Sequence, residues 1–265
     1  MKILIIGGNR FTGKLLAEAL IKINHEVTVF NRKGTGPEGL FSIIKGDRNN
    51  LEDLKRINFT HFDYIVDMCL YNPRQFKLIE PLLEQPNLKK YIFISSIASK
   101  ITSFGNYGIE KQLVEDRIKN STLPYIILQP TYIIGEKDHS NRLLQYINNL
   151  LSGKKLLVGG KGNKLINFVD VNDVCGVILK LIDSDLVHKE YEIGNSEMTS
   201  LDDLIYRLSL IINKIPKIQY YATTSPYTNN QCFATNFKIK QDINYSFTNF
   251  DNTLKEIYSS YENKS

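Results

Sequence analysis

The chain has 265 residues, 42% of them apolar and 23% charged, and a mild net charge of +5. These values are ordinary for a globular protein of one large domain, or of one domain with a small appendage, and they allow a sizeable buried core. The lysines are spread along the chain, with the densest cluster at Lys154, Lys155, Lys161 and Lys164. Such a cluster is typical of a solvated face. A nucleic-acid patch is the alternative, and nucleic acid is not the partner we expect.

The three cysteines, Cys69, Cys175 and Cys232, stand far apart and form no CxxC pair, and the four histidines are isolated from each other. This pattern argues against a disulfide framework and favours a reducing cytoplasm. Without a Cys/His cluster at ligand spacing, no metal site is expected. The apolar run at the start stops at Gly7, too early for a signal peptide, and no stretch approaches the ~20 apolar residues that cross a bilayer. We therefore expect a cytoplasmic protein with no membrane partner.

The first half of the chain alternates short apolar runs with helical patterns. Strands are predicted at 2–7, 26–31, 41–47, 64–69, 90–96 and 125–130, and helices at 13–23, 50–57, 74–84 and 107–120. The strands are near-continuous runs of Val, Ile and Leu, which is typical of strands buried on both faces. Their alternation with helices predicts right-handed crossovers and a Rossmann-like α/β fold with a doubly wound parallel sheet.

The second half is less regular. Helices are predicted at 141–153, 171–184, 200–213 and 250–261, and strand candidates lie at 155–160 and 165–171. The expected division is a dinucleotide-binding Rossmann domain at 1–165, to which part of 166–200 returns, and a smaller, interleaved substrate-binding portion at 166–265. We expect this small C-terminal α/β portion to fold against the open edge of the nucleotide domain as a lid.

The motif GGNRFTG, from Gly7 to Gly13, follows the first predicted strand and precedes the first predicted helix. This placement puts backbone N–H groups at a helix N-terminus, which is an anion site aided by the helix dipole. The glycines allow a tight turn and close packing of the helix on the strand. The motif therefore predicts a loop that binds the phosphates of a nucleotide.

The spacing G-x-x-R-x-x-G resembles the G-x-x-G-x-x-G loop of the extended and atypical short-chain dehydrogenase/reductases, which include the NAD-dependent epimerase/dehydratase family. Arg10 stands at the middle glycine, as in a subgroup whose loop reads GGTRF. The resemblance implies cofactor contacts from this loop and from the ends of the following strands. The residues so implied are Gly7, Asn9, Arg10, Phe11, Thr12, Gly13, Asp47, Arg48, Met68, Cys69, Leu70, Ser95 and Pro130.

The end of the second strand bears on the choice between NAD and NADP. NAD-selective sites usually place an Asp or Glu there to bind the ribose 2′-hydroxyl. Here the strand ends in Asn31, Arg32 and Lys33. Arginine and lysine attract a 2′-phosphate, and the Arg10 guanidinium can reach it as a bidentate partner. We predict NADP as the cofactor, with NAD as second choice. The alternative is that these cations are solvated turn residues.

A Tyr-x-x-x-Lys pair, Tyr107 and Lys111, opens the helix after the fifth strand, and its spacing puts both side chains on one helical face. The strand itself ends in FISS. By resemblance, Ser96 is the catalytic serine, Tyr107 the acid/base and Lys111 its partner, and both Tyr107 and Lys111 contact the cofactor. The alternative is a surface Tyr and Lys that open a helix.

The chemistry of this set is consistent with hydride transfer. A tyrosine ordinarily titrates near pH 10. A lysine ammonium and the positive nicotinamide ring lower that pKa, so Tyr107 can exchange the hydroxyl proton while hydride moves. Ser96 is placed to hydrogen-bond the developing alkoxide. Only ten residues separate Ser96 from Tyr107, about half of what the resembled epimerases have, which predicts a more open or differently shaped substrate pocket.

Weaker matches cover nearly all the rest of the chain. LQPTYIIG resembles the family's R-P-x-x-I-x-G segment, with Gln129 in place of the arginine. INFVDVNDVCGVI resembles the segment that places substrate-side residues around Asn167 and Asp170. The substrate-side residues implied are Tyr71, Tyr132, Arg142 and Asn167. No arginine that would clamp a sugar nucleotide is evident beyond Arg142.

The resemblance implies an NAD(P)-dependent epimerase, dehydratase or reductase that transfers hydride at a carbinol or carbonyl carbon, in many relatives that of a nucleotide sugar. Two alternatives stay open: a non-catalytic NADP-binding regulator, and an RNA-binding protein, since a GGTRF-like loop also occurs in chloroplast RNA-binding members. We expect a small-molecule substrate. We also expect a homodimer through the helices at 74–84 and 107–120, on the analogy of relatives. The sequence identifies neither the substrate nor the direction of the reaction.

Overall fold

A computed structural model of the chain describes residues 1–101, 104–138, 140–223 and 231–263, except for the side chain of Arg142. Its centre is a seven-stranded sheet in which every neighbouring pair is parallel and the order is β10-β6-β5-β4-β1-β2-β3. The strand order reverses between β1 and β4. In such doubly wound sheets a crevice for ligands opens at this point, beyond the carboxyl ends of the strands.

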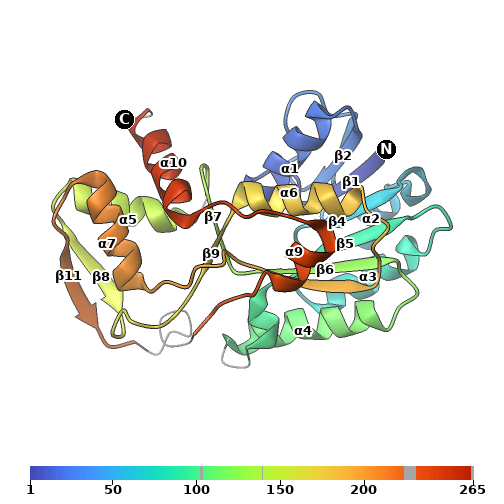
Figure 1. Cartoon of the computed structure of the whole chain (residues 1–265). Coiled ribbons are helices and arrows are strands. Elements are labelled where there is room, and N and C mark those ends of the chain that lie inside the picture. The colour runs from blue at the N-terminus through green and yellow to red at the C-terminus, as the bar shows by residue number, and fades with distance from the viewer. Residues whose placement is uncertain (102–103, 139, 224–230, 264–265) are drawn as a thin grey trace.

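The strands bury side chains on both faces of the sheet. They are β1 (Lys2–Ile6), β2 (Glu26–Asn31), β3 (Ser42–Lys45), β4 (Tyr64–Asp67), β5 (Lys90–Ile94), β6 (Tyr125–Pro130) and β10 (Lys189–Ile193). On β1, Ile3 and Ile5 pack with helices α1 (Phe11–Lys22) and α6 (Val171–Ile182). Leu4 and Ile6, which point to the other side, pack with α2 (Leu51–Lys55), α3 (Pro73–Leu83) and α4 (Gly105–Lys119). Figure 1 shows these two helix layers above and below the sheet.

A smaller lobe lies beyond the carboxyl ends of the strands (Figure 1). Its core forms between helices α5 (Arg142–Leu151), α7 (Leu201–Ile212) and α10 (Phe250–Glu262) and the parallel pair β8 (Lys155–Gly159) and β11 (Lys217–Tyr221). The helices are amphipathic: α7 buries Leu204 and Leu208 and exposes Tyr206 and Leu210 on its outer side.

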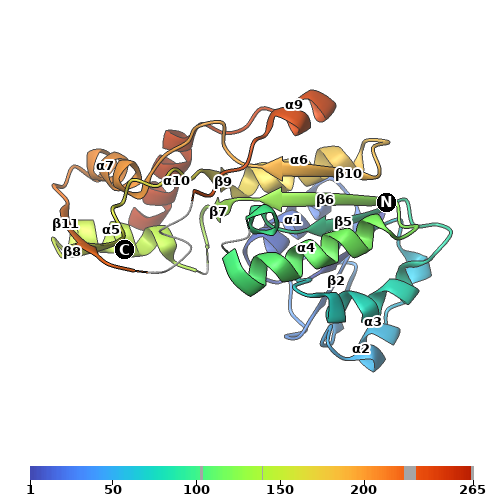
Figure 2. The same ribbon diagram turned by 90° about the horizontal axis from the view of Figure 1, so that it is seen from below.

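The chain passes between the two lobes several times. The short parallel pair β7 (Tyr132–Ile134) and β9 (Phe168–Asp170) lies where the lobes meet (Figure 2). After β9, helix α6 and strand β10 return to the large sheet, and α9 (Phe237–Ile243) packs against β10. Two short 3-10 helices, η1 (Phe59–His61) and η2 (Ile97–Lys100), follow α2 and β5.

The predicted Rossmann-like α/β fold with a doubly wound parallel sheet is confirmed, and a smaller lobe of helices and strands accompanies it. The small lobe begins earlier than the boundary expected at residue 165, because α5 and β8 pack with α7 and α10. Sequence patterns did not predict β7, β10, β11 or α9. Among helices in the described ranges, none combines the length and apolar content that a membrane span requires.

Candidate cofactor and active site

The phosphate loop joins β1 to α1 in the crevice of the sheet. Gly7 has a φ of +96°, which favours glycine, and a Cβ at Gly13 would lie 2.7 Å from the carbonyl oxygen of Gly7. Arg10 has a φ of −142°, an extended conformation that any residue adopts, so an arginine fits here without backbone strain. The strained residue is Phe11, with a φ of +37°. The side chain of Arg10, the N-cap residue, forms no capping hydrogen bond with α1. The backbone N–H groups at this helix end can therefore bind an anion.

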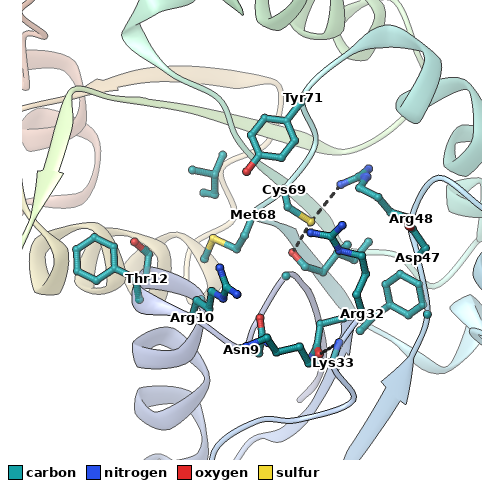
Figure 3. A pocket seen from close by; sticks show the side chains of 18 of the residues that line it. Asn9, Arg10, Thr12, Arg32, Lys33, Asp47, Arg48, Met68, Cys69 and Tyr71 are labelled. Carbon is teal, nitrogen blue, oxygen red and sulfur yellow. Dashed lines mark hydrogen bonds between the residues drawn. The ribbon is translucent and has the colours of Figure 1, made fainter. Parts of the chain in front are cut away.

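A cavity of about 740 Å³ opens above this loop, within the size range of ligand pockets. It follows the carboxyl ends of the strands from β2 and β3 to β5. Its lining consists of Ile6, Gly7, Asn9, Arg10, Phe11, Thr12, Gly13, Phe30, Asn31, Arg32, Lys33, Gly46, Asp47, Arg48, Asn49, Met68, Cys69, Tyr71, Gln75, Ile94 and Ile133. Figure 3 shows many of these side chains around the pocket.

Arg10, Arg32 and Lys33 line the pocket together (Figure 3). Within the described part of the chain, none of the three forms an ion pair. Asn31, also predicted as a cofactor contact, lines the pocket and shapes the turn after β2. Its Oδ1 accepts the N–H groups of Lys33 (3.1 Å) and Gly34 (2.9 Å), so its side chain shapes the turn that presents the cations.

The next strand connection contributes Asp47 and Arg48. Hydrogen bonds from Asn49 lower the pKa of Asp47 and keep it ionised at the pocket wall. Arg48 turns inward instead and forms a two-pronged ion pair with Asp67 at the end of β4, at 2.6 and 3.0 Å. Tyr91 donates to the same carboxylate at 3.0 Å. Because Arg48 is 6% and Asp67 0% exposed, this pair is a fixed part of the pocket floor.

Lys111 is buried on α4 beside the ends of β4 and β5. Its Nζ donates to the carbonyl oxygens of Leu70 (2.7 Å) and Ile94 (3.0 Å), at the ends of β4 and β5. It also lies 5.1 Å from the ring centre of Tyr71 and 4.8 Å from that of Phe93. Burial lowers the pKa of Lys111 to about 8, against the opposing attraction of Asp67. The ammonium is therefore mostly protonated at neutral pH and fixed in position.

Tyr107 lies on the first turn of α4, one helical turn before Lys111, and is 38% exposed. Ser96 caps η2, where its Oγ accepts the N–H of Ala98 at 3.2 Å. Because a hydroxyl both donates and accepts, the Ser96 proton is still available for a substrate oxygen. Ser95 faces away from this role, since its hydroxyl bonds to Glu115 on α4.

The structure brings together most of the predicted cofactor residues. All those of the phosphate loop line the cavity, as do Asn31, Arg32, Lys33, Asp47, Arg48, Met68 and Cys69, and so does the predicted substrate residue Tyr71. The cavity lining does not include Leu70, Ser95, Tyr107, Lys111 or Pro130, although Leu70 accepts a bond from Lys111.

The predicted substrate residues in and near the small lobe are Asn167, Tyr132 and Arg142. Asn167 is 2% exposed, and its amide bonds the backbone of Asn195 and Ala234, so it ties segments of the small lobe together and has no free polar atom for a substrate. Tyr132 packs its ring against Phe168. The side chain of Arg142 lies outside the described part of the structure.

Some site residues were missed from the sequence. Gln75, on α3, bonds Asn49 through its Nε2 (2.9 Å) and the N–H of Tyr71 through its Oε1 (2.8 Å), and so joins two pocket loops. Asp67 was missed although it is the lone acid ending a buried strand, which is a signal that a sequence offers. Nothing local marks Gln75. The described residues hold no group of His, Cys, Asp and Glu that could bind a metal ion.

Comparisons with known proteins agree with this geometry. Residues 75–194 match the model of the NAD dependent epimerase/dehydratase family, which confirms the predicted family resemblance. The chain is 24% identical over 234 residues to the chloroplast stem-loop binding protein of 41 kDa b of Arabidopsis thaliana, an alignment that covers 77% of this chain and 61% of that protein. It therefore spans about three fifths of that relative.

Solved structures share the whole fold. A variant of UDP-glucuronic acid 4-epimerase from Bacillus cereus, in complex with UDP-4-deoxy-4-fluoro-glucuronic acid and NAD, superposes with a TM-score of 0.85 at 19% identity over 100% of both chains. UDP-glucose 4-epimerase from Thermotoga maritima, with UDP-glucose, gives a TM-score of 0.82 at 17% identity over 100% of this chain and 99% of that one. At these identities the likeness establishes the fold.

Proposed function

We propose that the chain is an NAD(P)-dependent oxidoreductase of the short-chain dehydrogenase type, an epimerase, dehydratase or reductase that transfers hydride at a carbinol or carbonyl carbon of a small molecule. The observation that carries this proposal is one continuous crevice. It runs from the phosphate loop at Gly7 to Tyr71, beside a buried lysine one turn from an exposed tyrosine. The match to the epimerase/dehydratase family supports the same class.

The residues present fit a dinucleotide. A Cβ at Gly13 would lie 2.7 Å from the carbonyl oxygen of Gly7, so this glycine lets the start of α1 pack closely on the loop, as phosphate-binding loops require. Asp47 suits the adenine amine, and Met68 and Cys69 line the path toward the nicotinamide end. When bound, the nicotinamide supplies the position that accepts or gives hydride.

The protein's own residues move the substrate proton and stabilise the substrate oxygen. Tyr107 exchanges the proton of the substrate hydroxyl. The Lys111 ammonium, fixed by two carbonyls one helical turn from Tyr107, favours the phenolate of Tyr107. The Ser96 hydroxyl donates to the substrate oxygen as charge develops there.

We infer a preference for NADP over NAD. No carboxylate ends β2, and Arg10, Arg32 and Lys33 line the same pocket without ion-pair partners among the described residues. A 2′-phosphate would be bound by these cations, whereas the 2′-hydroxyl of NAD has no acidic partner there. The Bacillus cereus neighbour is described with NAD, so this preference is particular to this chain's residues.

Two measurements test the proposal. Calorimetric titration of the purified protein, cleared of co-purified cofactor, is expected to give a lower Kd for NADP than for NAD. Equal or tighter binding of NAD would overturn the preference. A substrate panel of nucleotide sugars and simple ketones, chosen because structural neighbours bind UDP sugars, then gives turnover. Tyr107→Phe is expected to lower turnover about 10²- to 10⁴-fold, with a much smaller effect on cofactor affinity. A regulator would keep its function in this variant.

RNA binding is a second candidate, favoured by the charge of the small lobe. Residues 139–169 contain five Lys or Arg and no Asp or Glu, and the Arabidopsis relative is named as a stem-loop binding protein. A stem-loop RNA would be held through its phosphates, so its affinity should fall steeply as salt rises. Absence of binding at low salt removes this candidate.

We also propose a homodimer through α3 and α4. Ile109 and Leu113, four residues apart on α4, are 48% and 51% exposed, and an ion pair of Arg117 with Glu80 fixes α4 to α3. Light scattering that finds a monomer at micromolar concentration contradicts this assembly.

A further inference from the structure

A buried acid lies directly beneath the proposed catalytic residues. Glu115 follows Tyr107 and Lys111 on α4 at successive four-residue steps and is 3% exposed. Its Oε1 accepts the hydroxyl of Ser95, and its Oε2 accepts the Nε2 of Gln129 at 2.8 Å. These partners come from the end of β5 and from β6, so Glu115 joins three elements around the site.

All of these partners are neutral. Within the described ranges, no lysine, arginine or histidine forms an ion pair with Glu115. The charged groups nearby are occupied elsewhere. Lys119, one turn further on α4, pairs with Asp116 and Glu190, and Lys100 of η2 pairs with Glu192 of β10. Lys111 donates to two backbone carbonyls.

A carboxylate in this position would be an uncompensated buried charge. Removing such a charge from water costs more free energy than hydrogen bonds from neutral donors return. Burial accordingly raises the pKa of Glu115, against the opposing effect of its bonds to Ser95, Ser99 and Gln129.

The identity of residue 129 is consistent with a neutral acid. The resembled segment carries an arginine where this chain has Gln129, which is 0% exposed and bonds directly to Glu115. An arginine there would supply the counter-charge that ionises the acid. A glutamine supplies a hydrogen bond without a charge.

We infer that Glu115 is held as a neutral carboxylic acid and acts as a positioning residue that locks the Ser95–Ser96 turn onto α4. The inference rests on the proposed function, because its consequence is catalytic. Lys111 lies between Glu115 and Tyr107 on the same side of the helix. An ionised Glu115 would offset the charge through which Lys111 favours the Tyr107 phenolate. The neutral acid fixes the geometry and leaves the field of Lys111 intact.

The charge of Glu115 is tested on the protein without cofactor or substrate. In the neutral acid one oxygen accepts from Gln129 and the protonated oxygen donates to Ser95, whose hydroxyl then accepts instead of donating. Glu115→Gln reproduces this pattern, because its amide oxygen accepts from Gln129 and its NH₂ donates to Ser95. The pKa of Tyr107 is read from ultraviolet tyrosinate difference spectra, with Tyr107→Phe in each background as the reference. We expect Glu115→Gln to leave this pKa unchanged. A lower pKa in the variant would mean that a negative charge had been removed, and would overturn the inference.

A second measurement uses the wild-type protein and so does not depend on the folding of any variant. In wild-type protein labelled with ¹³C at the glutamate carboxyls, carbon NMR is expected to show one carboxyl that stays protonated at pH 7. If every glutamate carboxyl titrates near its ordinary pKa of about 4.3, the inference fails. Both readouts are independent of cofactor binding and turnover, so their failure is distinct from failure of the proposed function.

The positioning role is tested by turnover. Glu115→Ala removes both bonds and releases the turn, and we expect kcat to fall on the order of tenfold to a hundredfold with little change in KM. Glu115→Gln is expected to restore most of that loss. Equal losses in the two variants would show that the charge of Glu115, rather than its hydrogen bonds, matters.

Discussion

The two lobes hold their charged groups in different ways. In the large lobe, Arg48 and Asp67 pair at the pocket floor with side chains 7% and 0% exposed. In the small lobe, Arg207 meets Glu197, Asp203 and Asp251 at once, with its side chain 23% exposed and its partners between 35% and 47% exposed. The first arrangement is a single buried pair, and the second is a network open to water. The pair at the pocket floor is therefore fixed in position, whereas water can solvate the groups of the Arg207 network.

The largest expected effect is the loss of the buried pair. Asp67→Asn leaves the Arg48 guanidinium buried without a counter-charge, and we expect the free energy of unfolding to fall by about 3–5 kcal/mol. Arg207→Met, the matched change in the small lobe, should cost about 1 kcal/mol because water solvates the remaining acids. Urea denaturation of both variants measures the difference. Similar losses of unfolding free energy in the two variants would contradict the difference between the buried pair and the solvated network.

The second largest expected effect is a change in stability with pH that is caused by Lys111. The pKa of Lys111 is about 8 in the folded chain, below the ordinary lysine value of about 10.4, because of burial. Between these two pH values Lys111 is protonated in the unfolded chain but largely neutral in the folded chain. The free energy of unfolding therefore rises with pH across this range, by about 3 kcal/mol in total.

The check is a comparison with Lys111→Met across pH. Wild-type protein should gain stability relative to this variant as the pH rises from 7 to 10, in thermal unfolding at each pH. The carbonyls of Leu70 and Ile94 lose their donor in the variant at every pH, so they shift the whole curve without changing its slope. A flat difference would mean that Lys111 titrates normally.

The large lobe could be predicted from local sequence because its signals are local. Buried strands such as β1 and β4 are short, mostly apolar runs, and the phosphate loop is a short motif in which Gly13 packs on the backbone of Gly7 and Gly8. In the small lobe, β11 is mostly exposed and exists because it pairs with β8, from Lys217 opposite Lys155 onward. Such a pairing, between segments about sixty residues apart, has no local signature.

The same distinction applies within the site. Tyr107 and Lys111 were predicted from one short motif, and both lie on α4 as expected. Their supporting contacts join distant segments: Lys111 with Ile94, Glu115 with Gln129, Arg48 with Asp67. A single sequence shows which polar residues it has, but the packing of α4 on the sheet decides which of them meet.

Glycine substitutions sharpen the contrast between loops. Gly13→Ala places a methyl group 2.7 Å from the Gly7 carbonyl oxygen, so α1 must shift. We expect a loss of about 2 kcal/mol in stability and at least a tenfold weaker NADP affinity. Gly153→Ala, in the small lobe, meets only the end of Lys217 at 3.9 Å and suffers mainly from its φ of +64°. It should cost about 1 kcal/mol and leave NADP affinity unchanged, as calorimetry and denaturation can show.

The smallest and most selective effect concerns the 2′-phosphate. Arg32→Glu places a carboxylate beside the turn held by Asn31, where NAD-selective sites carry one. We expect the Kd for NADP to rise about tenfold or more, which is about 1.4 kcal/mol per factor of ten, and the Kd for NAD to stay level or fall. Lys217→Glu makes the same change of net charge on the exposed strand β11 and should alter neither Kd.

This pair of variants separates a specific site from a general field. If Lys217→Glu weakened NADP as much as Arg32→Glu, the attraction would come from the overall positive charge of the protein and would vanish at high salt. If only Arg32→Glu acts, and more on NADP than on NAD, the contact is local to the 2′-position. The exposed charge at Lys217 in the small lobe then plays no part in cofactor choice.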